Sequence, residues 1–363
     1  MPTPIPAHIS LRFAALSFVC MLGVVLGHAY NLPMRYLQPW TTVGEALTFN
    51  RFVQFFCANG LIRPVVPLFF LMSGYLNLPS STEPHSQKIW KRAKSLLVPY
   101  LLWSYIGLCT YALMDMWPYG RTLIEYASLG SFSNMRILDY NWHQLLYRWI
   151  MEPIPFQLWF LRVLFVYTAL SPWLVKAVAR YPIATLSTFS VLWFTGFEMY
   201  FVEGDGLFFF TLGLWIRQRG IDLEHPAISR HLPWMAVLWI TLLLVKAWLA
   251  FQCPHLNGLQ FILFRLSQPM GIYVLWCSSL HWAGLDRLAA LSKYNLVVYG
   301  FHVPILYFVT DAVLLTHAPA GEWLHFGVFF GSFAAVAAVC VLLGKGMRML
   351  MPSMAELMTG GRL

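Results

Sequence analysis

The chain has 363 residues, of which 59% are apolar and only 11% charged, whereas a soluble protein carries about 25% charged residues. This composition and a mean hydropathy of +0.62 exclude an ordinary soluble domain. The formal net charge of +9 is carried mainly by short segments between apolar runs, and this placement, typical of membrane topology signals, argues against a nucleic-acid partner.

Ten apolar segments follow in chain order, each near the ~20 residues that a helix needs to cross the hydrocarbon core of a bilayer. They are continuous rather than alternating, which favours helices, and they cover residues 11–31, 61–78, 96–114, 156–176, 182–200, 206–217, 233–251, 259–281, 294–314 and 324–344. With a cytoplasmic N-terminus, fifteen Lys and Arg residues of the loops fall inside and five outside. We therefore predict an all-α, polytopic membrane helical bundle of about ten transmembrane helices, with both termini in the cytoplasm.

Three stretches between the apolar segments do not fit as spans. Residues 43–59 are amphipathic and predict a helix at the outer interface. Residues 79–95 form the most basic cytoplasmic loop, and residues 115–155 form a long outer loop rich in Trp and Tyr. We expect none of the three to cross the membrane.

Ionisable side chains inside the segments are candidates for function, because a charge at the centre of a bilayer costs about 2.5–3.5 kcal/mol. His28 ends the first segment, where it either donates to a carbonyl of a neighbouring helix or acts as a general base toward a sugar hydroxyl. Arg63 and Arg162 lie at segment edges, where they either anchor at the interface or meet a buried partner. Lys246 and Arg265 lie within segments in no recognisable motif.

Three further positions have both a structural and a chemical interpretation. Asp205 opens the sixth segment and could orient a histidine, pair with an arginine or cap a helix. His302 precedes Pro304, which frees a backbone carbonyl that the imidazole could satisfy. The small pair Ser73 and Gly74 predicts close helix packing, whatever else it does.

Six sequence pieces follow one another between residues 16 and 305. They are Leu22 to His28, Val66 to Leu76, Trp90 to Arg92 with Leu97 to Tyr100 and Trp103, Leu158 to Arg162, Phe208 to Gly213, and Leu291 to Tyr294 with Tyr299 and His302. In this order they resemble acyltransferase family 3, the integral-membrane O-acyltransferases that modify bacterial surface polysaccharides and related glycans. The similarity extends over residues 11–344 and identifies 1–363 as a single transmembrane acyltransferase domain of the bacterial inner membrane.

The resemblance implies a ten-helix bundle in which acyl-CoA enters from the cytoplasm and a carbohydrate hydroxyl is presented from the outer side or the membrane. It implies no tightly bound cofactor and no metal. By position, His28 matches the essential base of the family, and Arg63 and Arg162 fall on arginines that hold donor or acceptor. Ser73 and Tyr75 match the small-aromatic motif beside the tunnel.

The reaction that we expect transfers an acyl group, acetyl by family default, from acyl-CoA to the hydroxyl. Lys88, Lys91 and Arg92 either anchor to anionic lipid or receive the phosphates of the donor. Arg63 is the candidate that stabilises the oxyanion, beside His28 as base, and in a dry site one such donor is worth about 2.7–4 kcal/mol. Asp205 and His302 complete the predicted site, Asp205 in a catalytic role and His302 in binding.

One position departs from the family pattern. Family members carry an arginine eleven residues before the histidine, and Ser17 stands there in this chain, with Arg12 as the nearest cation. Either another cation substitutes, or donor binding is altered, or the protein is a catalytically lapsed assembly partner. A transporter of glycans or lipid-linked sugars is the alternative from another class, but the inverted repeats and paired broken helices typical of transporters are not evident.

Overall fold

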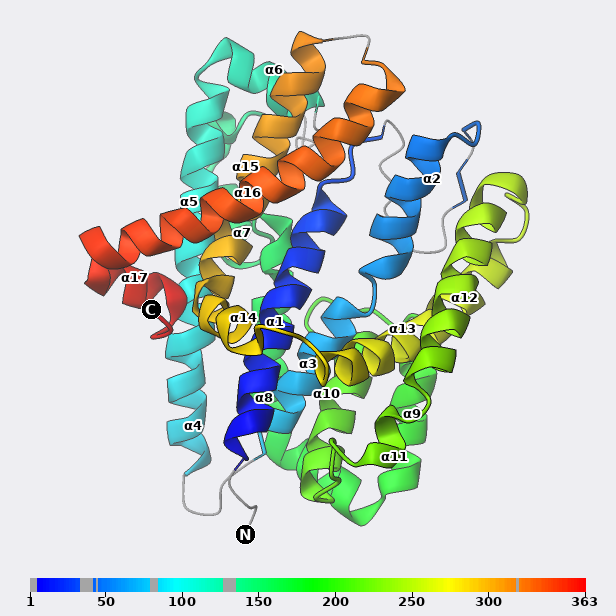
Figure 1. Cartoon of the computed structure of the whole chain (residues 1–363). Coiled ribbons are helices and arrows are strands. Elements are labelled where there is room, and N and C mark those ends of the chain that lie inside the picture. The colour runs from blue at the N-terminus through cyan, green and yellow to red at the C-terminus, as the bar shows by residue number, and fades with distance from the viewer. Residues whose placement is uncertain (1–4, 33–41, 44, 79–83, 127–134, 318–319) are drawn as a thin grey trace. The chain divides into compact units, whose positions relative to one another are not determined.

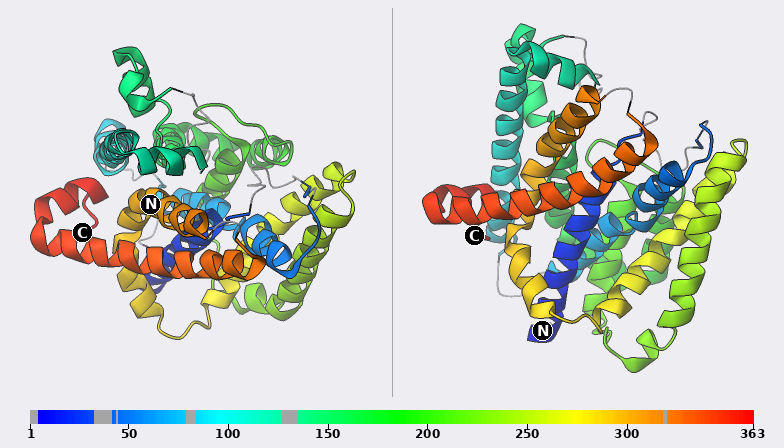
Figure 2. Two further views of the ribbon diagram at one scale, coloured as in Figure 1. Left: turned by 90° about the horizontal axis from the view of Figure 1, so that it is seen from above. Right: turned by 45° about the horizontal axis from the view of Figure 1, so that its top comes forward.

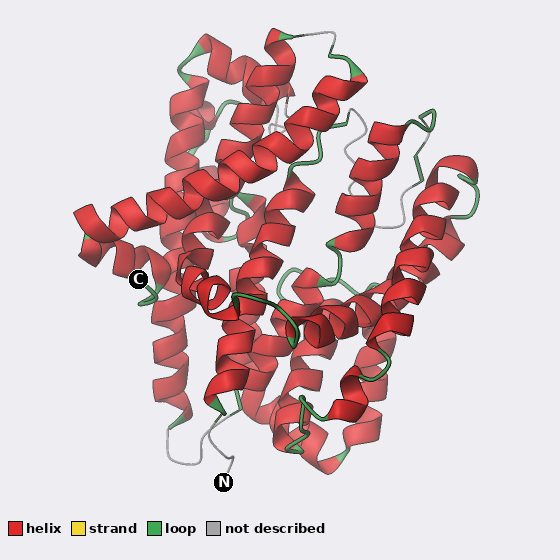
Figure 3. Cartoon of the chain, in the orientation of Figure 1, coloured by secondary structure: helices red, strands yellow, loops and turns green. Residues whose placement is uncertain are grey.

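The computed structural model describes the whole chain except residues 1–4, 33–41, 44, 79–83, 127–134 and 318–319. Every regular element in the described part is a helix, so the predicted all-α class is confirmed (Figures 1 and 3). The described residues form two compact units, each discontinuous in sequence: unit 1 is Met1–His85 with Val166–Ser292, and unit 2 is Ser86–Phe165 with Lys293–Leu363. That the chain is a single functional domain stays a prediction.

Unit 1 is built from helices that pack pairwise, and α12 and α13 lie side by side (Figure 2). Its elements are α1 (Ala7–His28), α2 (Phe49–Phe56), the π-helix η1 (Cys57–Leu61), α3 (Val65–Leu76), most of α8 (Trp159–Arg180), α9 (Pro182–Phe194), α10 (Gly204–Gln218), α11 (Pro226–Ser229), α12 (Leu232–Gln252), α13 (Asn257–Ser279) and α14 (Leu285–Leu291).

Unit 2 contains the remaining helices, and its α15 and α16 pack against each other (Figures 1 and 2). Its elements are α4 (His85–Arg92), the π-helix η2 (Ala93–Leu97), α5 (Val98–Asp115), α6 (Pro118–Tyr126), the short 3-10 turns η3 (Ile137–Asp139), η4 (Phe156–Leu158) and η5 (Ser292–Tyr294), α7 (Trp142–Ile150), α15 (Asn295–Thr316), α16 (Glu322–Leu350) and α17 (Pro352–Thr359).

Seven helical stretches of the described chain are long and apolar enough to cross a membrane, which supports a multi-pass membrane protein. They are Ala7–His28, Phe49–Leu76, His85–Asp115, Phe156–Arg180, Pro226–Gln252, Leu285–Thr316 and Glu322–Leu350. The predicted segments 182–200, 206–217 and 259–281 also form helices, namely α9, α10 and α13, which are not among the seven. The count of ten and the N-in, C-in orientation therefore stay predictions.

The segment 43–59 differs from the interfacial helix that its amphipathic pattern predicts. Only α2 is helical before η1, and its polar residues Asn50 and Gln54 are buried whereas Phe49 is 62% exposed. The amide of Gln54 donates to the side-chain oxygens of Asn31 at 3.0 Å and of Asn50 at 2.9 Å. Lipid reverses the usual rule, because a polar face there must turn toward protein to find its hydrogen bonds.

The basic stretch 79–95 also differs from the predicted loop. Residues 79–83 lie outside the described residues, and from His85 onward the chain is helical. The helix α4 continues through η2 into α5, so that Lys88, Lys91 and Arg92 extend as a helical end from a membrane-spanning stretch.

The predicted outer loop 115–155 folds back along α5 in its second half. The backbone N–H of Ile137 donates to Asp115 at the C-terminal end of α5, at 2.7 Å. The indole of Trp149 donates to the carbonyl of Leu101 at 2.9 Å, near the other end. These two contacts lie fourteen residues apart on α5, which is about 20 Å of helix. The segment with α7 therefore re-enters the apolar length of α5 instead of remaining a loop (Figure 1).

Two glycines allow α3 and α10 to pack at backbone distance. A Cβ atom on Gly74 would lie 1.9 Å from the carbonyl oxygen of Phe210, and one on Gly213 would lie 2.1 Å from that of Leu71. No other residue fits at either position without moving a helix. The close packing predicted for the Ser73 and Gly74 pair is confirmed, and it fixes α3 against α10.

Candidate active site

His28 is the last residue of α1 and is half-buried in unit 1. The preceding Gly27 packs on Ile62, because a Cβ atom there would lie 2.8 Å from the side chain of Ile62. His28 and Arg63 each follow this contacting pair by one residue. The structure thus places a potential base and a cation each one residue after this contact, the first at the end of α1 and the second in the turn after η1.

The π-helix η1 shapes the backbone on which Arg63 sits. The N–H of Ile62 donates to the carbonyl of Cys57, five residues earlier, at 3.2 Å, and Pro64 supplies no N–H to continue the ladder. The carbonyl of Asn59 is left to accept from the amine of Lys246 at 2.6 Å. Single π-turns of this kind are frequent at functional sites.

Lys246 reaches this turn from α12 with only 1% of its surface exposed. Its amine lies 5.5 Å from the ring centre of Phe55 and 5.7 Å from that of Phe264, so aromatic faces and one carbonyl hold the charge. The side-chain amide of Asn59 is buried and makes no hydrogen bond among the described residues. Unit 1 therefore has polar groups in its interior at the turn that leads to Arg63, not an entirely apolar core.

Asp205 lies in the first turn of α10 and pairs with an arginine. The guanidinium of Arg265 is 2.6 Å from one carboxylate oxygen, and the amide of Gln268 donates to the other at 3.0 Å. The indole of Trp193 donates to Gln268 at 2.8 Å. Of the three alternatives for Asp205, the arginine pair is the one observed, and the N-cap position is occupied by Glu203.

Glu203 has an oxygen that is buried and accepts no hydrogen bond among the described residues. Burial, followed by the charges of Asp205 and Glu198, raises the pKa of this carboxyl well above its usual value. The folded protein thus binds the proton more tightly than the unfolded chain does. The free energy of unfolding therefore falls as the pH rises above the unfolded pKa toward the folded pKa, and this group has no effect below both.

Replacing Glu203 with Gln is expected to remove that pH dependence. The variant should melt at a higher temperature than the wild type near pH 8 and at the same temperature near pH 4, because both forms are then neutral. Thermal unfolding of the purified protein in detergent at the two pH values measures the difference. An equal shift at both pH values would contradict the titration of Glu203 as its cause.

The residues of the small-aromatic motif lie on α3. Tyr75 is buried, with the ring of Phe13 edge-on at 5.2 Å and the guanidinium of Arg217 over its face at 5.2 Å. Ser17 donates to the carbonyl of Ala14 in its own helix at 2.7 Å. Arg12 forms an ion pair with Glu224 and lies over the ring of Trp276. These contacts hold the start of α1 in place.

The predicted site residues of unit 2 have identifiable structural roles. Arg162 donates to the carbonyl of Met151, the residue that ends α7. His302 is fully buried, and its Nδ1 lies 2.9 Å from the carbonyls of Val298 and Tyr299, one turn earlier in α15. The carbonyl that Pro304 frees belongs to Gly300 and is not one of these two. His302 nevertheless contacts backbone carbonyls of its own helix, as the structural interpretation of the sequence predicts.

The structure divides the predicted residues between the two units. His28, Arg63, Ser73, Tyr75 and Asp205 lie in unit 1, and the others, Lys88, Lys91, Arg92, Arg162 and His302, lie in unit 2. Sequence reasoning gave no role to Lys246, Arg265, Gln260 or Gln268. The signal for the two glutamines is their spacing, because Gln260, Phe264 and Gln268 recur every four residues and form one stripe of α13.

Chemically, unit 1 offers an imidazole and a guanidinium, each one residue after the contact of Gly27 with Ile62. The chain matches the family model of an acyltransferase domain over residues 15–345. It is also similar to ExoH, a succinoglycan biosynthesis protein of Rhizobium meliloti (strain 1021), with 23% identity across 98% of this chain and 93% of that protein. No solved structure matches the chain at a significant level. Since the family model covers nearly the whole chain, the protein belongs to acyltransferase family 3 and is a multi-pass membrane acyltransferase of groups other than aminoacyl groups.

Proposed function

We propose that this protein is an O-acyltransferase of the bacterial inner membrane that moves an acyl group, acetyl by family default, from acyl-CoA to a hydroxyl of a surface glycan or a lipid-linked sugar. The observation that carries the proposal is the contact of Gly27 with Ile62, the residues that directly precede His28 and Arg63. The role in succinoglycan biosynthesis of the similar ExoH supports a carbohydrate acceptor.

In the proposed reaction His28 takes the proton of the acceptor hydroxyl as the oxygen attacks the thioester carbonyl. A C–O bond forms, and the guanidinium of Arg63 stabilises the negative charge that develops on the carbonyl oxygen. The C–S bond then breaks, and the thiolate of coenzyme A leaves and receives the proton from the imidazolium. No oxidant or further co-reactant is needed.

The donor is proposed to approach through the cationic helical end formed by α4. Lys91 is exposed and Lys88 and Arg92 are half-exposed, which suits contact with the phosphates of a soluble coenzyme. Tyr75, with Arg217 over its ring, is a candidate to line the path of the pantetheine arm in unit 1.

Mass spectrometry of the surface glycan from cells with and without this protein tests the function. We expect the deletion to remove the mass increment of one acyl group from the repeating unit, and a wild-type copy to restore it. Unchanged acylation with a reduced amount of exported glycan would refute the proposal and favour transport. The mass that is lost also names the acyl group.

A further inference from the structure

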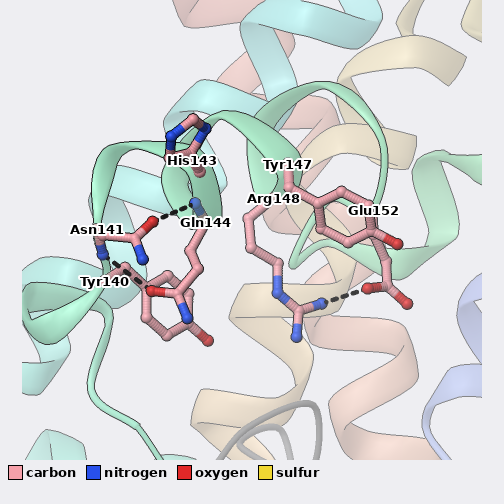
Figure 4. A pocket seen from close by; sticks show the side chains of 7 residues that line it. All are labelled: Tyr140, Asn141, His143, Gln144, Tyr147, Arg148 and Glu152. Carbon is pink, nitrogen blue, oxygen red and sulfur yellow. Dashed lines mark hydrogen bonds and ion pairs between the residues drawn. The ribbon is translucent and has the colours of Figure 1, made fainter.

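A pocket of about 470 Å³ opens on unit 2 beside α7 (Figure 4). Its walls come from the single stretch 140–152 and include Tyr140, His143, Tyr147 and the ion pair of Arg148 with Glu152. The volume falls in the range of about 300–1,000 Å³ that is common for small-molecule sites. All of its lining residues belong to unit 2.

The pocket lies alongside a membrane-spanning stretch. The hydroxyl of Tyr100 donates to the carbonyl of Ile150 at 2.8 Å, and that of Ser104 donates to the carbonyl of Trp149 at 2.6 Å. Both donors belong to the first half of α5, within the apolar stretch His85–Asp115. Polar groups beside such a stretch are costly to desolvate, which argues for a function.

The short helix α7 has two distinct faces. Trp142, Leu146 and Ile150 follow at four-residue intervals and are 65%, 43% and 39% exposed, which forms an apolar stripe suited to lipid. Arg148 lies opposite this stripe, is only 7% exposed and lines the pocket, and Tyr147, which is 47% exposed, lies between the two and lines it as well. The pocket is therefore the polar face of a re-entrant amphipathic helix.

The charges within the pocket cancel. The guanidinium of Arg148 lies 3.0 Å from the carboxylate of Glu152, so the cation already has its anion (Figure 4). Asn141 and Gln144 form the capping box of α7, with both hydrogen bonds at 2.9 Å. A phosphate-bearing ligand would meet the Glu152 carboxylate without a spare cation, so this balance favours a neutral ligand.

The remaining lining matches the chemistry of a sugar ring. The rings of Tyr140 and Tyr147 provide flat apolar surfaces with a hydroxyl at the edge. A pyranose has an apolar face of C–H groups. Its hydroxyls can accept hydrogen bonds from the guanidinium of Arg148 and donate hydrogen bonds to the carboxylate of Glu152. We propose that the α7 pocket binds a neutral saccharide, the carbohydrate part of the acyl acceptor; this assignment rests on the proposed function.

Calorimetric titration of the purified full-length protein in nanodiscs, without acyl-CoA, tests the pocket directly. The probe is the set of neutral oligosaccharides released from the deacylated surface glycan of cells that lack this protein. We expect Tyr147→Ala to weaken binding by about tenfold or more. Tyr147→Phe should keep most of the affinity because it keeps the ring. The matched control is Leu146→Ala, on the apolar face of the same helix and outside the pocket lining, which should bind as the wild type does.

Three outcomes would overturn the pocket as a saccharide site: no binding by the wild type, equal affinity in the Tyr147→Ala and wild-type proteins, or displacement of the saccharide by free coenzyme A. The last would make it a donor site. Because the titration contains no donor, a protein that acylates the glycan yet binds no saccharide refutes the pocket alone. A protein that binds the saccharide, but whose deletion leaves glycan acylation unchanged, refutes the proposed transfer.

Discussion

Replacing His28 with alanine should abolish acyl transfer and leave the protein folded and inserted in the membrane. General-base catalysis contributes about 10²–10⁴-fold to a rate, and a sugar hydroxyl is too poor a nucleophile to dispense with it. The residue ends α1 and is only half-buried, so that truncation leaves no large cavity in the core. The measurement is acyl-CoA-dependent labelling of the glycan by membrane vesicles, normalised to the amount of protein.

The matched control for His28 is His317→Ala, at the exposed end of α15 in unit 2. That variant should retain wild-type labelling and the same detergent melting temperature. Labelling by the His28→Ala protein at the wild-type rate would refute the role of the imidazole as base. A second variant, Arg63→Lys, keeps the charge but not the planar fork, and should lower the rate constant if the guanidinium stabilises the oxyanion.

Removing the carboxylate of Asp205 should strongly destabilise unit 1. Asp205→Ala leaves the guanidinium of Arg265, whose side chain is 4% exposed, without its anion. Breaking such a pair costs about 3–5 kcal/mol, and the lower end applies here because the side chain of Asp205 is itself 26% exposed to screening solvent. We expect a lower melting temperature and reduced accumulation in membranes, measured by fluorescence-detected thermal unfolding.

The double variant Asp205→Ala with Arg265→Met separates the charge from the packing. If the cost arises from an uncompensated cation, the second substitution should recover most of the lost stability, because an apolar replacement of a buried pair is often neutral. Glu198→Ala removes an exposed carboxylate from the loop between α9 and α10 and should have little effect on stability. A single Asp205→Ala protein as stable as the wild type would mean that solvent already screens the pair.

Sequence alone predicted the helical class and the close packing at Gly74, because long apolar runs and small residues act locally. Gly74 is an example, since a residue without a side chain in an aromatic helix predicts a close neighbour. The ion pair of Asp205 with Arg265 joins residues sixty positions apart, and no local pattern encodes which cation α10 meets. Neither residue lies within the local sequence around the other, so the pairing is determined only by the tertiary structure.

Two other differences have physical causes. The amphipathic pattern of α2 predicted that its polar residues face water. In a membrane these residues instead face the protein, where Gln54 donates to Asn31. The helix α7 is too short and too polar to be recognised from the sequence as a membrane segment. Only its hydrogen bonds to α5 show that it lies beside a membrane-spanning stretch.

The wide turn of η1 lets one helical stretch, Phe49–Leu76, contact two different neighbouring helices. Successive residues of an α-helix are rotated by about 100° about its axis. The one extra residue of the π-turn between α2 and α3 therefore changes the direction in which every later side chain of the stretch points. Gln54 before the turn and Gly74 after it can therefore both point inward, the first to the end of α1 and the second to α10. Deleting one residue of Cys57–Leu61 would rotate α3 by about 100° relative to α2 and move Ile62 away from Gly27.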